Sequence, residues 1–386
     1  MIIIEKMSNI EYQISRSHKA YLALLRAALW GDNELTNERM RELTKEEVNE
    51  VIRLAGFQGT GPLVYDQLLK LKDVNIHADL RMQMKQQCVH SMMLQQSMFG
   101  TLSQAWNALV AADVHPVLLK GFALAQYYPQ PHLRQWGDID LYVGQKQYHA
   151  ACKVLQTTFP NADHPAEEDE ERKHYNFILP NTVLELHRIS MAFAHPRDRK
   201  YYEGLEERYL TKDGLAVEVD GLLITMPDDT FNLFFTFLHA WHHFIETGMN
   251  MKQLCDIAIL LHAKREAINQ KQLHEMLTKL HLMEPWQLMM YIMVHYLGVP
   301  QKESPFYTEK NRGLAELLFT RIMSEGSSRR PAVFDTKGMP YIKRKWLTFQ
   351  LRRSDGRLVR PYAPRYARRM IIGDLLHGFE RLLKRK

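Results

Sequence analysis

Apolar residues recur at intervals of three and four along most of the first 110 residues. The segments EYQISRSHKAYLALLRAAL (11–29) and MKQQCVHSMMLQQSMFGTLSQAWNALVAA (84–112) show this spacing, which is the period of an α-helix. In TKEEVNEVIRLAG, Thr44 precedes Glu47 by three residues, a capping-box spacing, so a helix is predicted from there to Gly56. We interpret the methionines of this region as flexible core filling rather than as a soft binding surface. They are Met82, Met84, Met92, Met93 and Met98.

After residue 113, short apolar runs and alternating patterns replace the helical spacing, which predicts strands. Two buried strands are expected, and two further segments each read as a pair of strands around a turn. These segments are, in order, VHPVLLKG (114–121), DIDLYV (138–143), HYNFILPNTVLELHRI (174–189) and GLAVEVDGLLITM (214–226). Helices are expected over 122–131 and 145–159, between the first strands.

Helical spacing returns after residue 228, so the chain divides by pattern into four parts. With 386 residues it is too long for one simple core. We predict an N-terminal helical region (1–110), an α/β core (111–226), a C-terminal helical domain (227–340) and a basic tail (341–386). The predicted fold class is α+β, a mixed-sheet core flanked by helical regions.

Acidic residues occupy one face of two predicted strands. In DIDLYV, Asp138 and Asp140 point away from the apolar face, and in VLELH, Glu185 and His187 do the same. If these strands are neighbours, three carboxylates converge and repel one another unless a cation lies among them. An all-oxygen donor set favours Mg²⁺ or Mn²⁺. The alternatives are strand-end aspartates that cap turns or pair with Arg134, and a Glu185–His187 pair that meets basic residues across the hairpin.

Basic residues and a glycine precede this strand. Lys120-Gly121 ends the first strand and opens a helix, where backbone amides and a lysine charge can bind a phosphate. Arg134, four residues before Asp138, can hold another phosphate. The alternative is that Lys120-Gly121 is simply a tight strand-to-helix turn. Metal carboxylates beside an anion cradle predict a site for a metal-bound triphosphate.

The segment VLLKGFALAQYYPQPHLRQWGDIDLYV, with the later HYNF and LELH, resembles the nucleotidyltransferase superfamily that includes DNA polymerase beta and antibiotic adenylyltransferases. In particular it looks like an uncharacterised bacterial nucleotidyltransferase family in which Lys-Gly replaces the usual Gly-Ser. The resemblance covers residues 45–265, and a departure is Phe122 where a serine is usual.

The resemblance implies a nucleotidyltransferase-like core that moves a nucleoside monophosphate from a nucleoside triphosphate to an acceptor hydroxyl. It implies that Asp138 and Asp140 are catalytic metal ligands and that Glu185 is the third acid, a ligand or base. We group the remaining candidates as nucleotide-binding: Lys120, Gly121, Arg134 and His187. The alternatives are a non-catalytic nucleotide-binding or scaffold protein on the same fold, and an adaptor that acts through its tail.

Charge is distributed unevenly along the chain. The net charge is +6, but residues 341–386 alone carry +11, which leaves −5 for the rest. Nucleic acid or an anionic membrane is therefore expected as a partner only through this tail. The apolar positions 371, 372, 375, 379, 382 and 383 form one helical stripe, and we expect this stripe to dock on the protein's own core.

Cysteine use and hydropathy indicate a cytoplasmic protein. The three cysteines are far apart in the chain, which argues against a disulfide framework and a cysteine zinc site. The start MIIIEKMSN lacks the pattern of a signal peptide, and no apolar run approaches the roughly 20 residues that span a bilayer.

Overall fold

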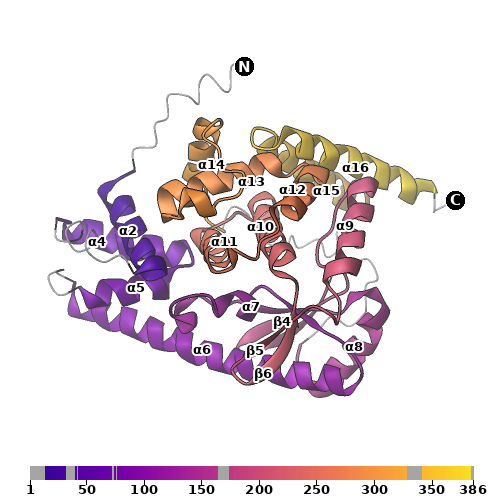
Figure 1. The fold of residues 1–386 in the computed structure, drawn as a ribbon, viewed down its shortest axis with the longest axis horizontal. Helices are drawn as coiled ribbons and strands as arrows, with labels where there is room; N and C mark the ends of the chain where they lie inside the picture. The colour runs from indigo at the N-terminus through magenta and orange to yellow at the C-terminus, as the bar shows by residue number, and fades with distance from the viewer. Residues whose placement is uncertain are drawn as a thin grey trace. The chain divides into compact units, whose positions relative to one another are not determined.

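The computed structural model divides the chain into two compact units, which are described separately (Figure 1). It describes residues 14–31, 40, 42–71, 74, 76–163, 174–327 and 341–383. The first unit comprises 1–88, 237–265 and 280–371, and the second comprises 89–236, 266–279 and 372–386. Among the described helices, none is both long enough and apolar enough to cross a membrane.

Within the described residues the first unit is built from helices. Thr44 and Glu47 form the predicted capping box at the start of the helix Lys45–Phe57, which ends one residue after the predicted Gly56. The helices are α2 (Arg16–Trp30), α4 (Lys45–Phe57), α5 (Gly61–Lys70), α11 (Met251–Lys264), α13 (Met283–Ile292), α14 (Arg312–Glu325) and α15 (Tyr341–Val359). A short π-helix (Met293–Leu297) extends α13, and a 3₁₀ turn (Gln301–Glu303) precedes α14. Three helices have residues in both units: α6 (Ala78–Ala111), α10 (Asp229–Glu246) and α16 (Pro364–Leu383).

The second unit contains the sheet. Its strands are β1 (Val117–Leu119), β2 (Asp138–Tyr142), β3 (His174–Leu179) and β4 (Thr182–His187), in the order β1-β2-β4-β3. β2 runs parallel to β4 and antiparallel to β1, so the sheet is mixed. The predicted hairpin of β3 and β4 is confirmed, and β5 (Leu215–Val219) and β6 (Leu222–Met226) form a separate two-stranded sheet. The fold class is therefore α+β, as predicted.

Among the described residues, the helices that lie wholly within the second unit are α7 (Phe122–Ala125), α8 (Gly144–Thr158), α9 (Pro196–Tyr209) and α12 (Gln270–Lys279), with a 3₁₀ turn at Pro131–Leu133. Of these, α8 packs with α6 against one face of the four-stranded sheet. Ile139 and Leu141 of β2, and Leu184 and Leu186 of β4, pack into one core with buried residues of α6 and α8. Figure 1 shows α6 and α8 beside the strands. The alternation in β2 and β4 leaves the acidic side chains on the other face.

Three expectations from the sequence need correction. Met84 and Met98 are buried, but Met82, Met92 and Met93 are exposed, so core filling was the wrong interpretation for these three. The cause is the length of α6, which spans 34 residues and presents a face to solvent along much of it.

The second correction concerns the helix expected over 122–131. Its regular part, α7, covers only four residues, and the chain then continues through turns and the short 3₁₀ turn at 131–133. Pro129 and Pro131 account for the early end, because proline removes a backbone donor and restricts the residue before it.

The tail forms the predicted helix but docks through another face. Gly373 is buried, and a Cβ atom there would overlap the backbone of Ala194 and His195, all within the second unit. Ile371 and Leu375 of the predicted docking stripe are 46% and 52% exposed. The side chains of positions 379, 382 and 383 lie outside the described residues.

Candidate functional site

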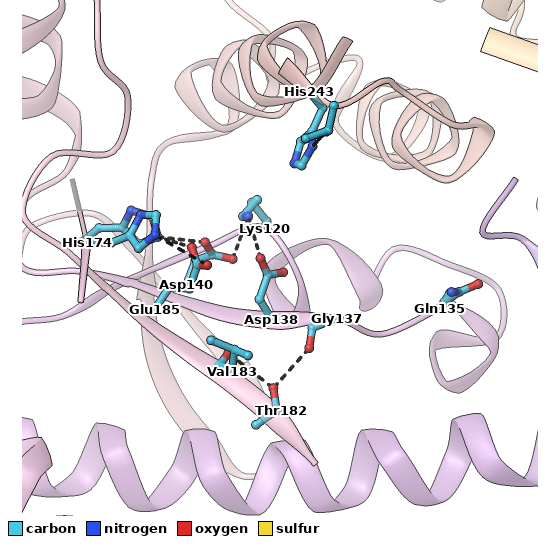
Figure 2. Close-up of polar contacts among 12 residues, drawn as sticks. Lys120, Gln135, Gly137, Asp138, Asp140, His174, Thr182, Val183, Glu185 and His243 are labelled. Carbon is cyan, nitrogen blue, oxygen red and sulfur yellow. Dashed lines mark hydrogen bonds and ion pairs between the residues drawn. The ribbon is translucent and has the colours of Figure 1, made fainter. Parts of the chain in front are cut away.

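The three predicted acids converge on the face of the sheet opposite the hydrophobic core (Figure 2). In the parallel register of β2 and β4, Asp140 lies opposite Glu185, and Asp138 lies two residues before Asp140 on the same face. A carboxylate oxygen from each of the three lies within 4.8 Å of the others. The convergence predicted from the alternating pattern is confirmed, because the two strands are direct neighbours.

A lysine from the end of β1 sits among these carboxylates. The Lys120 Nζ atom lies 2.9 Å from Asp140 Oδ2 and 3.4 Å from Asp138 Oδ2. Lys120 and Gly121 both have positive φ, 49° and 46°, and Gly121 combines this with a ψ of −112°, which suits glycine. This turn places the Lys120 side chain over β2, so the ammonium supplies part of the charge that the aspartates need.

Two histidines complete the cluster. The His187 Nε2 atom lies 2.9 Å from Asp140 Oδ1 and 3.3 Å from Glu185 Oε2. The His174 Nε2 atom lies 3.8 Å from Glu185 Oε1, and its ring centroid is 5.0 Å from that of His187. The hairpin register places His174 opposite His187, which explains why the two rings meet.

The electrostatics follow from this packing. Burial disfavours the charged imidazolium, but hydrogen bonds to Asp140 and Glu185 outweigh it and raise the pKa of His187 to about 9. Burial and the Asp138 charge raise the pKa of Asp140, while Lys120 and His187 oppose them. The histidines and Lys120 outweigh burial at Glu185 and lower its pKa. The cluster therefore balances three acids against the cations Lys120 and His187.

The donor set suits a divalent cation. Three carboxylates against two cationic side chains leave one net negative charge at the centre of the cluster. The Asp140 side chain is 1% exposed, whereas the Asp138 side chain is 44% exposed, so the cluster opens to solvent on the Asp138 side. Oxygen donors at this spacing are those that Mg²⁺ and Mn²⁺ prefer.

The remaining sequence candidates are Gly121 and Arg134. Gly121 follows Lys120 and is the N-cap of α7, and a Cβ there would be 3.5 Å from the Asp138 carbonyl oxygen. Arg134 is buried with its guanidinium over the Trp136 ring, 5.7 Å from the centroid. Phe122, at the position where a serine is usual, is buried, and its ring centroid is 4.5 Å from that of Trp136. This position serves the core, so it brings no hydroxyl to the site.

Sequence reasoning missed one member of the cluster, His174, and the ion pairs of another, Lys120. It assigned Lys120 to a phosphate and did not foresee the ion pairs with Asp138 and Asp140. Strand patterning gives no information about the backbone reversal at Lys120 and Gly121, on which those pairs depend. His174 was also missed, although pairing HYNF against LELH across the hairpin would have placed it opposite His187.

A family model described as an uncharacterised nucleotidyltransferase matches residues 44–298, more than half of the chain. The matched range includes every candidate residue of the cluster. No curated protein and no solved structure matches the chain.

Proposed function

This chain belongs to the uncharacterised nucleotidyltransferase family, and from that premise we propose that it moves a nucleoside monophosphate from a nucleoside triphosphate to an acceptor hydroxyl. The observation that carries the proposal is the cluster of Asp138, Asp140 and Glu185, whose oxygens lie within 4.8 Å of one another on adjacent parallel strands. Burying acids together is costly, and a chain that retains them needs a use for their charge.

In this proposal Asp138, Asp140 and Glu185 hold Mg²⁺ or Mn²⁺. When bound, such ions would lower the pKa of the acceptor hydroxyl and neutralise charge on the triphosphate. Asp140 is the anchored ligand, because His187 fixes one of its oxygens at 2.9 Å. Asp138 is the adaptable ligand, because its side chain is the more exposed of the two.

Lys120 has two tasks in this scheme. Without substrate its ammonium balances Asp138 and Asp140 at 3.4 and 2.9 Å. With substrate present, the same ammonium provides a positive charge for the phosphates beside Gly121. Arg134 is a second candidate for phosphate. Because α7 has only four residues, we assign phosphate binding to Lys120 and local amides rather than to a long helix dipole.

The chemical step is an in-line displacement. The acceptor oxygen forms a bond to the α-phosphorus, the bond from that phosphorus to the bridging oxygen breaks, and pyrophosphate leaves. In this proposal Glu185 accepts the hydroxyl proton; the histidines beside it lower its pKa and so support an ionised carboxylate. His187 holds Asp140 and Glu185 in position through its Nε2 atom.

The test is nucleotide turnover by the full chain. We expect pyrophosphate release from a mixture of nucleoside triphosphates with Mg²⁺ and candidate hydroxyl acceptors, and its loss in Asp140→Asn. The matched control is Asp213→Asn, an exposed aspartate in the same unit, which should retain full activity. Turnover that survives Asp140→Asn would contradict the assignment.

A second candidate function is nucleotide binding without transfer. Phe122 favours it, because the residue after Gly121 is committed to the core with Trp136 and supplies no hydroxyl for phosphate. Mg²⁺-dependent triphosphate binding that persists with no pyrophosphate release would support this alternative.

A further inference from the structure

A pocket lies between α9 and α12 of the second unit, on elements other than those that carry the carboxylate cluster. Its volume is about 510 Å³, within the usual range for small-ligand sites. Every residue that lines it belongs to the second unit. Nothing in the proposed function uses it.

The pocket is positively charged. Arg197, Lys200 and Arg208 of α9 line it, and their spacing places them along one face of the helix. Among the described lining residues the acidic one is Glu275 of α12. Three cations against one carboxylate leave two net positive charges, which attract a dianion.

The remaining walls are apolar and aromatic. Leu205 and Met276 are buried at the pocket, and the rings of Tyr201 and Tyr209 are half-buried there. The Arg208 guanidinium lies over the Tyr209 ring, 5.2 Å from its centroid. Such a lining accommodates a planar ring beside the charges.

From these features we propose that the α9–α12 pocket binds a small aromatic phosphate ester, with its ring between the tyrosines and its phosphate on the basic side chains. A phosphate monoester carries between one and a half and two negative charges at neutral pH, about the net charge of the lining. The proposal goes beyond nucleotidyl transfer and stands whether or not the carboxylate cluster is catalytic.

Gly204 provides a test at the wall of the pocket. It lines the pocket from within α9, and a Cβ there would meet nothing within 4 Å. Gly204→Leu therefore adds a bulky side chain at this wall from an unobstructed Cβ position, and it replaces a poor helix former by a good one. Gly100→Leu in α6 is the matched control, since its Cβ position is equally open.

The measurement is calorimetric titration of the full chain with phenyl phosphate in EDTA, which keeps divalent ions from the carboxylate cluster. We expect binding to the unaltered protein and to Gly100→Leu, and at least a tenfold loss in Gly204→Leu. Equal affinity in Gly204→Leu, or no binding to the unaltered protein, would overturn the proposal.

Two further arms test the chemistry of the ligand. Lys200→Ala should weaken phenyl phosphate binding about tenfold, the scale of one lost charged hydrogen bond, while Lys153→Ala on α8 should not. Phenol and inorganic phosphate should each bind more weakly than phenyl phosphate. If inorganic phosphate binds as tightly, the pocket is a plain anion site and the aromatic part of the proposal is wrong.

Discussion

Two buried carboxylates of the second unit, Asp140 and Glu206, are held in opposite ways. Asp140 is 1% exposed and meets two cations, with Lys120 Nζ and His187 Nε2 both at 2.9 Å. Glu206 is 4% exposed, and its Oε1 atom accepts hydrogen bonds from the Ser190 amide at 2.5 Å and the Ser190 hydroxyl at 2.6 Å. Asp140 is thus surrounded by charge, whereas the donors recorded for Glu206 are neutral.

Under the proposed function, this difference distinguishes an acid of the proposed site from an acid with a structural role. Burial raises the pKa of Glu206 to about 7, although the Ser190 donors pull it down, so this group tolerates a proton. At Asp140, Lys120 and His187 oppose the rise in pKa that burial causes. In the proposed function, a bound metal ion could take over the contacts that these cations make with Asp140. We infer that Asp140, with its cationic partners, belongs to the proposed site, and that Glu206, with its hydroxyl and amide donors, holds the fold.

Among these variants, Lys120→Met is expected to lower the unfolding free energy most. It removes one of the two cations at Asp140 while keeping the side-chain volume. Leaving a buried charge without its partner typically costs about 3 to 5 kcal/mol of unfolding free energy. Denaturant unfolding measures this, and Mg²⁺ should restore part of the loss. Lys146→Met on the surface of α8 is the control and should change little. An unchanged stability in Lys120→Met would show that the ion pairs are dispensable.

Glu206→Gln tests whether Glu206 makes the unfolding free energy depend on pH. Because the pKa of Glu206 is raised in the folded state, its contribution to stability is complete below about pH 4.5 and is lost as pH rises through about 7. The wild type should lose about 2 to 3 kcal/mol over this range through Glu206, and the Gln variant should not. Unfolding at pH 5 and pH 8 measures the difference. Glu203→Gln, exposed on the same helix, should keep the wild-type slope.

Gly373→Ala tests the packing near the structural acid Glu206. The tail packs on the segment that joins Ser190, which binds Glu206, to α9. The new Cβ would overlap the backbone of Ala194 and His195, so we expect a loss of about 1 to 3 kcal/mol. In a free helix the same change gains about 1 kcal/mol. Thermal unfolding distinguishes these outcomes, with Gly100→Ala as the control that should gain stability. If both variants gain stability alike, the tail does not dock at Gly373.

Alternation along two strands made the carboxylate face predictable from sequence. Leu184 and Leu186 had to face the core, so Glu185 had to face away, and a parallel neighbour carrying Asp140 then completed the cluster. The sequence left open whether these strands are neighbours, because patterning alone does not establish adjacency; the family resemblance implied only that Glu185 is the third acid. Local sequence signals also predicted structure correctly. Thr44 and Glu47 predicted the start of α4, and Asp220-Gly221 predicted the turn between β5 and β6.

Features that depend on tertiary packing could not be read in the same way. The helix α9 was missed, although Pro196 at its start is a helix signal, because its mean hydropathy is low and its apolar face is narrow. Gly373 reads as a weak point of a helix, and only the neighbouring backbone shows it to be a close contact. The spacing of apolar residues likewise gives no sign of the backbone reversal at Lys120 and Gly121.

Asp138→Asn is expected to change stability least and therefore separates function from folding most cleanly. The substitution relieves the repulsion that raises the pKa of Asp140, but it also loses the 3.4 Å ion pair with Lys120. Because the Asp138 side chain is 44% exposed, solvent screens both effects, and the net change in unfolding free energy should stay below about 1 kcal/mol.

If Asp138 is a metal ligand, the same substitution should remove most of the rise in melting temperature that Mg²⁺ gives the wild type. Melting curves of both proteins with EDTA and with Mg²⁺ measure the two quantities together, and Asp213→Asn controls for the loss of one surface charge. A variant that melts far below the wild type in EDTA, while Mg²⁺ leaves the wild type unchanged, would place Asp138 with Glu206 among the structural acids.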